Sequence, residues 1–328
     1  MQALRVEALS GDLSGVALRD VPVPERAVGQ VLVRVRAAAL NHPDLLMSRG
    51  AYQFKPALPF TAGMEMAGEV IETGPDSAFA IGDPVMGGMK TGCFAQVCAV
   101  PEAMMQAIPT GLDVTTAAAL GVAYRTAYTA LVEFGRLRAG QWVLVHGASG
   151  GVGMAACDLA TALGARVIAT THRAGKIERM RTVARAEHVI LNEGRFRDAV
   201  ADITDGALCD IVFDPVGGDV FDESTRCVAF GGQVQIIGFV AGRIASVPAN
   251  IPLIKGFSVV GVRAGEYARR FPGRGTAVGR EIASLAAQGR IAPVIDRVLP
   301  LSQWRDGYGA MAAGEVMGKV VFEPNEAP

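Results

Sequence analysis

The stretch Val143–Lys176, VLVHGASGGVGMAACDLATALGARVIATTHRAGK, decides the fold class. An apolar run is followed by clustered glycines, an Ala-rich stretch and a second apolar run that ends in basic residues. This order predicts a strand at Trp142–Val145, a helix from about Gly151 to Leu163 and a strand at Arg166–Thr170. A strand–helix–strand unit of this length indicates a parallel sheet.

The glycines fall where the first strand meets the helix. The first N–H groups of a helix lack partners and favour an anion, and glycine lets a pyrophosphate approach the backbone. Ala148 stands at the first position of the GxGxxG pattern, and Gly153 is expected to let the helix pack closely on the strand. We expect the turn to bind a dinucleotide through four residues: Ser149, Gly150, Gly151 and Val152.

The end of the second strand bears on which dinucleotide is bound. An NAD site usually has an Asp or Glu there for the ribose, whereas this chain has Thr171, His172, Arg173 and Lys176. A hydroxyl and two cations suit a 2′-phosphate, so the sequence predicts NADPH; ordinary solvated charge is the alternative. The missing acid also disfavours an adenosyl-dependent methyltransferase, which would use a similar glycine turn.

The rest of the chain extends this plan on both sides. Short strands expected at His188–Leu191, Ile211–Asp214, Gln233–Ile237 and Ser258–Val262 alternate with helices and predict a doubly wound sheet. The N-terminal part has short strands between Gly- and Pro-containing turns, and the chain ends in an apolar strand. We therefore expect a β-rich domain over 1–122, a nucleotide-binding domain over 123–262, and a return to the first domain over 263–328.

Composition excludes several classes of protein. The 328 residues carry 31 basic and 32 acidic side chains, so no net charge favours nucleic acid or an anionic membrane. The N-terminus lacks a signal-like apolar core, and no apolar run approaches the ~18 residues of a membrane span. Five scattered cysteines without a CxxC pair indicate reduced thiols, as expected of a cytoplasmic protein.

A series of motifs in order carries a family resemblance. They are Asn41-His42-Pro43-Asp44, Arg49-Gly50-Ala51-Tyr52, Gly63-Met64-Glu65, Gly150-Gly151-Val152-Gly153, Asp214-Pro215-Val216-Gly217-Gly218 and Gly318-Lys319-Val320. Over essentially its whole length the chain resembles the zinc-independent, zeta-crystallin-like quinone oxidoreductase branch of the medium-chain dehydrogenase/reductase superfamily. The resemblance implies an α/β fold, with a GroES-like β-rich catalytic domain and a Rossmann domain, and a homodimer.

Zinc-dependent members of the superfamily carry a Cys-His pair and a Gly-His-Glu motif. Here the corresponding positions hold Asn41 and Met64, which removes a thiolate and an imidazole from the ligand set. We therefore expect no metal, and hydride transfer to a carbon made electron-poor by the substrate itself, such as that of a quinone or an α,β-unsaturated carbonyl.

The resemblance also implies roles for single residues. Tyr52 matches a tyrosine near the substrate, where its hydroxyl could donate a hydrogen bond or a proton. Asn41 matches a position that faces the nicotinamide, although its place in a tight turn also allows a structural role. Asp44 is expected to be an ion-pair or turn residue.

Further cofactor contacts are expected outside the glycine turn. Thr126 and Arg263 match cofactor-proximal positions of relatives, and Asn192 is expected beside the adenine. Val216, Gly238 and Phe239 fall at or just after the carboxyl ends of predicted strands, where such sheets bind ligands. Arg125 has no assigned role.

The preferred function is an NADPH-dependent reductase of quinones or α,β-unsaturated carbonyls. Two alternatives stay open: an enoyl-CoA or other enoyl-thioester reductase, and an NADPH-binding structural or regulatory protein with little turnover. The basic run Arg269, Arg270 and Arg274 could hold the phosphates of a carrier arm, with solvated charge as the simpler interpretation.

Overall fold

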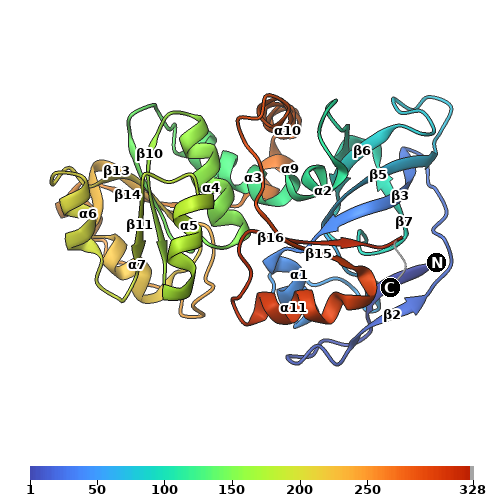
Figure 1. Ribbon diagram of the computed structural model, residues 1–328, viewed down its shortest axis with the longest axis horizontal. Helices are drawn as coiled ribbons and strands as arrows, with labels where there is room; N and C mark the ends of the chain where they lie inside the picture. The colour runs from blue at the N-terminus through green and yellow to red at the C-terminus, as the bar shows by residue number, and fades with distance from the viewer. Residues whose placement is uncertain (326–328) are drawn as a thin grey trace. The chain divides into compact units, whose positions relative to one another are not determined.

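The computed structural model describes residues 1–325 and divides them into two compact units. Unit 1 combines Met1–Val122 with the segment that begins at Ile295, and unit 2 is Ala123–Val294 (Figure 1). The first boundary lies where the sequence places it. The second lies after Val294, so the segment 263–294 packs in unit 2, whereas we had expected it to return to the β-rich domain.

Polar contacts of two helices explain the second boundary. These helices are α9 (Ala264–Arg270) and α10 (Pro272–Ala287). Tyr267 Oη donates to Glu133 Oε2 at 2.5 Å, and Arg274 Nη2 lies 2.5 Å from the same carboxylate. Arg125, which the sequence left without a role, donates from Nη1 to the carbonyl oxygen of Gly275 at 2.9 Å. Unit 2 therefore retains both helices.

Unit 1 is built on β-sheets that are antiparallel apart from one parallel pair. A seven-stranded sheet has the order β15-β16-β3-β5-β6-β8, with β7 also pairing with β3, and a three-stranded sheet has the order β2-β1-β4. The strands are β1 (Gln2–Val6), β2 (Val16–Asp20), β3 (Gln30–Ala39), β4 (Phe60–Thr61), β5 (Glu65–Glu72), β6 (Pro84–Gly88), β7 (Val97–Pro101), β8 (Met105–Ala107), β15 (Ile295–Pro300) and β16 (Lys319–Glu323). The helical segments are α1 (His42–Ser48), η1 (Glu102–Met104), α2 (Val114–Ala119), η4 (Leu301–Gln303) and α11 (Trp304–Ala312).

The core of unit 1 joins residues from both of its chain segments. Phe94 meets Phe322 of β16 edge to face at a centroid distance of 5.2 Å, and Tyr308 of α11 stacks on Phe322 at 6.4 Å. Gly307 permits this packing, because a Cβ there would lie 2.7 Å from the Phe322 ring. The C-terminal strand is thus an integral part of the β-rich unit.

Unit 2 is a six-stranded parallel sheet in the order β11-β10-β9-β12-β13-β14. The strands are β9 (Trp142–Val145), β10 (Arg166–Thr171), β11 (His188–Leu191), β12 (Cys209–Asp214), β13 (Val228–Ile236) and β14 (Ser258–Gly261). The remaining helical segments are α3 (Gly121–Tyr128), η2 (Thr129–Phe134), α4 (Gly151–Ala162), η3 (Ala174–Lys176), α5 (Ile177–Val183), α6 (Arg197–Ile203), α7 (Gly218–Ser224) and α8 (Asn250–Lys255). Helix α3 starts at the end of unit 1 and runs into unit 2.

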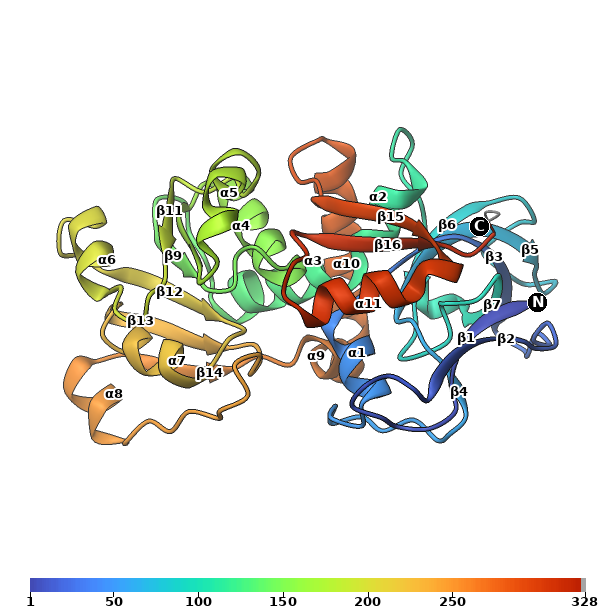
Figure 2. The same ribbon diagram turned by 60° about the horizontal axis from the view of Figure 1, so that its bottom comes forward.

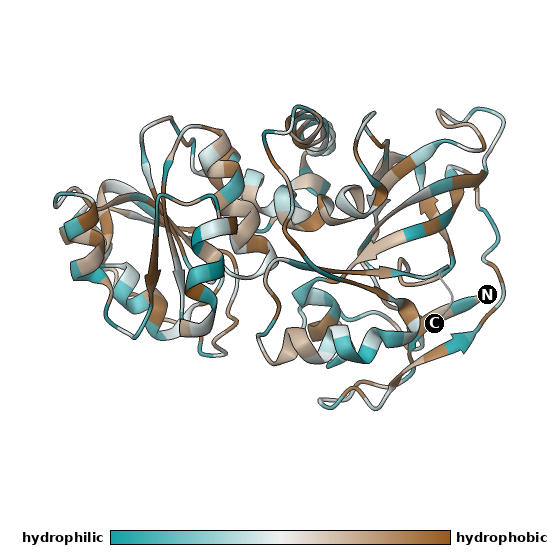
Figure 3. Ribbon diagram, viewed as in Figure 1, coloured by the Kyte–Doolittle hydropathy of each residue, from teal (hydrophilic) through white to brown (hydrophobic). Residues whose placement is uncertain are grey.

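The sheet of unit 2 is covered on both faces. Helices α4 and α5 lie over one face and α7 over the other (Figure 2). The central strand β9 is buried at every position, and the apolar strands stand out brown among mixed helices in Figure 3. The expected doubly wound arrangement is therefore confirmed.

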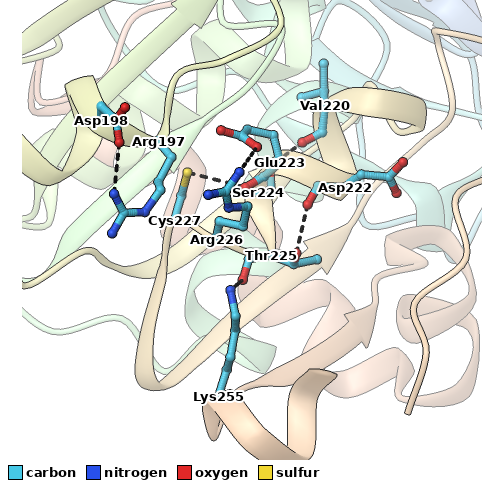
Figure 4. A network of polar contacts seen from close by, with 10 residues as sticks. All are labelled: Arg197, Asp198, Val220, Asp222, Glu223, Ser224, Thr225, Arg226, Cys227 and Lys255. Carbon is cyan, nitrogen blue, oxygen red and sulfur yellow. Dashed lines mark hydrogen bonds and ion pairs between the residues drawn. The ribbon is translucent and has the colours of Figure 1, made fainter. Parts of the chain in front are cut away.

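A hydrogen bond links the end of α8 to Thr225, the C-cap of α7 (Figure 4). Lys255 Nζ, at the end of α8, donates to the carbonyl oxygen of Thr225 at 3.1 Å. Cys227 Sγ donates to the carbonyl oxygen of Glu223 at 3.5 Å, and Arg226 pairs with the Glu223 carboxylate. Of these contacts, the one made by Lys255 links the end of α8 to the C-cap of α7.

Candidate functional site

The glycine turn forms the centre of the candidate cofactor site. After β9 the chain turns at Gly147, whose φ is +55°, and the N–H of Ala148 donates to the carbonyl oxygen of Thr170 at 3.0 Å. Gly150 is the N-cap of α4 and has no side chain to cap the first helical N–H groups. A turn of this kind presents unpaired backbone donors to an anion.

Close approach requires glycine at Gly153, and the positive φ favours it at Gly147. A Cβ on Gly153 would lie 2.5 Å from the carbonyl oxygen of Gly147 and 2.8 Å from Cα of Ala148, so the start of α4 packs tightly on the turn that follows β9. A Cβ on Gly147 would lie 3.3 Å from Val216 Cγ2, at the end of a neighbouring strand. The turn therefore sits directly against the end of β12.

The basic residues follow the end of β10, the strand that pairs with β9. The buried Thr171 accepts a hydrogen bond at Oγ1 from the N–H of Arg173 at 3.2 Å. Partial burial, with the nearby charges of Arg173 and Lys176, lowers the pKa of His172. This corner of the edge therefore brings together His172 and the two cations Arg173 and Lys176.

The other strand ends place further predicted cofactor residues along the same edge. The N–H of Asn192, which follows β11, donates to the carbonyl oxygen of Thr171 at 2.7 Å. The N–H of Val216 donates to Oδ1 of the buried Asp214 at 2.8 Å. Phe239 lies beside Gly217, and a Cβ on that glycine would be 3.1 Å from Phe239 Cδ1. Gly238 donates from its N–H to the Asp214 carbonyl oxygen at 3.4 Å.

Two predicted cofactor residues lie on other elements of unit 2. Thr126 is half-buried in α3. Arg263 is exposed at the N-cap of α9, immediately beyond the edge strand β14.

His146, which the sequence did not single out as functional, supports this edge from beneath. It is fully buried, with Nδ1 2.9 Å from Thr170 Oγ1 and Nε2 2.8 Å from Ser224 Oγ. Burial lowers its pKa to about 3, so the imidazole is neutral and donates through one nitrogen only. These two hydrogen bonds link the residue that follows β9 to β10 and to α7.

Unit 1 contains a buried polar cluster around Asn41. Lys319 Nζ donates to Asn41 Oδ1 at 2.6 Å and to Glu65 Oε1 at 2.8 Å. Asn41 Nδ2 donates to Glu65 Oε1 at 2.8 Å and to the carbonyl oxygen of Ala39 at 3.1 Å. Asn41, Glu65 and Lys319 are all buried, and Asn41 is 6% exposed. We call these three residues the Asn41 cluster.

The cluster limits what Asn41 can offer a ligand. Both N–H groups of its amide donate within unit 1, while Oδ1 accepts from Lys319 and faces the Asp44 N–H in the capping box of α1. Toward a ligand, the amide of Asn41 can therefore act only as an acceptor, through Oδ1, and not as a donor. Sequence reasoning missed Glu65 and Lys319, although both stand in the motifs that carried the resemblance.

Asp44 has the turn role expected of it, but its carboxyl group is buried. Its Oδ2 accepts the N–H of Asn41 at 2.9 Å, which closes the first turn of α1. Its Oδ1 is buried without a hydrogen-bond partner among residues 1–325. Burial raises the pKa of Asp44 to about 7, with the Asn41 N–H and the Lys319 charge acting in the opposite direction.

Tyr52 is half-buried in the loop between α1 and β4 and packs against the core of unit 1.

The arginines of the basic run form ion pairs within unit 2. Arg269 and Arg270 both pair with Glu266, and Arg274 pairs with Glu133 and Glu281. This engagement favours a structural interpretation of the run.

The His, Cys, Asp and Glu side chains of residues 1–325 form no group of three placed to hold a metal ion. None of their helices combines the length and apolarity needed to cross a membrane.

Comparison with known proteins agrees with this architecture. Residues 27–110 match the family described as alcohol dehydrogenase GroES-like domain, and residues 151–289 match the family described as zinc-binding dehydrogenase. A GroES-like unit with such a nucleotide-binding unit defines a medium-chain dehydrogenase/reductase.

Individual relatives indicate the family within this superfamily. Quinone oxidoreductase-like protein 2 of Mus musculus is 37% identical over 92% of this chain and 87% of its own length. A probable oxidoreductase from Mycobacterium abscessus superposes with a TM-score of 0.91 at 34% identity, covering 99% of both chains. A mycobacterial protein solved in complex with NADPH also gives 0.91, at 26% identity, over 99% of this chain and 100% of that one. The chain belongs to the quinone oxidoreductase family of medium-chain dehydrogenase/reductases.

Proposed function

We propose that the protein is an NADPH-dependent reductase of quinones or α,β-unsaturated carbonyl compounds that works without zinc. The observation that carries the proposal is the glycine turn with Arg173 and Lys176 at the end of the next strand. A pyrophosphate suits the uncapped start of α4, and a 2′-phosphate suits the electropositive corner around His172. The NADPH complex of the mycobacterial relative supports the same choice of cofactor.

The residues present fit this cofactor. Ser149, Gly150, Gly151 and Val152 would hold the pyrophosphate, with Thr171, His172, Arg173 and Lys176 at the 2′-phosphate and Asn192 at the adenine. Val216, Gly238, Phe239, Thr126 and Arg263 are further proposed contacts. Bound NADPH would supply a hydride.

We assign the catalytic roles of unit 1 to Asn41 and Tyr52. Asn41 Oδ1 would accept a hydrogen bond from a hydroxyl or amide N–H of the cofactor, because its own N–H groups are engaged. The Tyr52 hydroxyl would hydrogen-bond the acceptor oxygen, or deliver a proton to the substrate as its negative charge develops. Asn41 and Met64 at the positions of zinc ligands in relatives support chemistry that depends on the acceptor's own electrophilicity.

The experiment that tests the function measures NADPH oxidation by the purified protein with quinones, simple enones and enoyl-CoA esters. We expect turnover with quinones or enones. Turnover confined to enoyl-CoA esters would replace the proposal with a thioester reductase. NADPH binding without turnover of any acceptor would favour a structural or regulatory role. We further propose a cytoplasmic location, which the free, buried state of all five cysteines supports.

A further inference from the structure

The amide of Asn41 is held in one orientation. The two ends of a carboxamide have nearly the same shape, so packing alone distinguishes them poorly. Here the ammonium of Lys319 can only donate and the carboxylate of Glu65 can only accept. Lys319 Nζ donates to Asn41 Oδ1 at 2.6 Å, and Asn41 Nδ2 donates to Glu65 Oε1 at 2.8 Å. A reversed amide would place a donor against the donor Lys319 and an acceptor against the acceptor Glu65.

The pair that provides this orientation is itself buried. The side chains of Lys319 and Glu65 are 4% and 3% exposed and lie 2.8 Å apart. The second oxygen of Glu65 accepts the N–H of Val122 at 2.6 Å, which fixes the carboxylate. Because desolvation offsets the attraction of a buried ion pair, stability alone accounts poorly for two charges at this place.

We propose that Lys319 and Glu65 are positioning residues that keep Asn41 Oδ1 available as a hydrogen-bond acceptor. They would act on the reaction only through Asn41, whose contact with the cofactor rests on the proposed function. A cofactor hydroxyl or amide N–H would then meet an acceptor that is already oriented.

The orientation can be measured without ligand or activity. In nitrogen-15 NMR spectra, the carboxamide signals of Asn41, identified by their loss in Asn41→Ser, should show two protons protected from exchange. The exposed Asn250 provides the unprotected reference. Exchange of the Asn41 protons as fast as those of Asn250 would overturn the proposal with no reference to any variant of the buried pair.

Variants then test the cause of the orientation. Lys319→Met combined with Glu65→Gln removes both charges and leaves neither one unpaired. We expect this double variant to shift the Asn41 signals and speed their exchange. Arg36→Met combined with Glu69→Gln removes an exposed ion pair of the same unit and is the matched control, in which the protection of Asn41 should survive. Unchanged Asn41 signals in the double variant would overturn the proposal.

A double-mutant cycle links orientation to binding. The NADPH dissociation constant, followed by fluorescence, should rise about tenfold in Asn41→Ala and about tenfold in the charge-neutral double variant. In the triple variant it should rise no further, because both changes remove one contact. Multiplying effects would overturn the proposal. If the wild-type protein did not bind NADPH, the proposed function would fail, while the NMR measurement would still decide the orientation.

Discussion

The hydroxyl of Tyr124 and the backbone N–H of Ala292 donate to the same oxygen, Asp158 Oδ2, at 2.6 and 2.8 Å. Tyr124 lies just after the point where the chain enters unit 2, and Ala292 just before the point where it leaves. Arg185 pairs with the other oxygen of Asp158 at 2.8 Å. One carboxylate on α4 therefore holds together the first and the last segment of unit 2.

Asp158→Ala should destabilise the protein by about 2–4 kcal/mol, because it leaves the buried Tyr124 hydroxyl and the part-buried Ala292 N–H unpaired. Tyr124→Phe should cost less, about 1 kcal/mol. Urea unfolding measures both changes. Asp198→Ala, at a side chain 91% exposed on α6, is the control and should leave the midpoint unchanged. An unchanged midpoint for Asp158→Ala would contradict the fastening role.

Much of unit 2 could be predicted from local sequence. Strands Trp142–Val145 and His188–Leu191 have their expected bounds, and the other expected strands of the sheet overlap the observed ones. Buried parallel strands read as short apolar runs, and glycine marks their ends, so the signal is local. The glycine turn was predictable for the same reason.

The second boundary and the Asn41 cluster were not predictable in this way. Helices α9 and α10 stay with unit 2 through contacts to Glu133 and Arg125, which are more than a hundred residues away in sequence. Lys319 and Glu65 are separated by 254 residues, and neither has a local pattern that indicates its partner. A motif match drew attention to both positions, but only the fold shows that they hold one amide.

Arg173→Ala combined with Lys176→Ala should weaken NADPH binding by on the order of ten- to a hundredfold, because charge-assisted bonds to a phosphate are lost. NADH binding should change little, since NADH has no 2′-phosphate. Titration calorimetry with both cofactors measures the two constants. Arg280→Ala, which removes an exposed cation on α10, is the charge control. Parallel losses for NADPH and NADH would remove the assignment.

Asp44→Asn should gain stability relative to wild type as pH rises. The pKa of Asp44 is about 7 in the folded protein against 3.8 for an ordinary aspartate, so the folded state binds its proton more tightly. Its favourable contribution is complete below 3.8 and is lost as pH rises through about 7. Since asparagine does not ionise, the stability difference should move toward the variant by about 1.4 kcal/mol per pH unit between these values.

Urea unfolding at several pH values checks this trend, and Asp113 provides a control of opposite sign. Its partial burial acts to raise its pKa, but hydrogen bonds from Thr116 prevail and lower it. The stabilising effect of the Asp113 carboxylate is therefore present above the ordinary pKa and lost in acid. A pH-independent difference for Asp44→Asn would contradict the neutral, buried carboxyl.

We expect a homodimer that pairs two copies at β14, the last strand in the order of the unit 2 sheet. Phe230, Leu253 and Ile254 are 88%, 82% and 73% exposed on β13 and α8 and provide apolar surface for such a contact. Phe230→Glu with Leu253→Glu should convert the dimer to a monomer of 34.2 kDa in sedimentation velocity. Ile81→Glu, an exposed apolar position in unit 1, should leave the dimer intact. A monomeric wild type would refute the expectation.

Tyr52→Phe separates the hydroxyl of Tyr52 from its ring. The ring packs against the core of unit 1, and phenylalanine preserves that packing. If the hydroxyl assists the acceptor oxygen, kcat with enones should fall on the order of a hundredfold while the NADPH dissociation constant stays the same. Tyr267→Phe is the matched control, because that hydroxyl donates to Glu133 within unit 2 and its loss should reduce stability without a selective loss of turnover. Steady-state kinetics with enones and quinones, beside thermal melting of both variants, checks the pair. Full turnover by Tyr52→Phe would transfer proton delivery to water or another group.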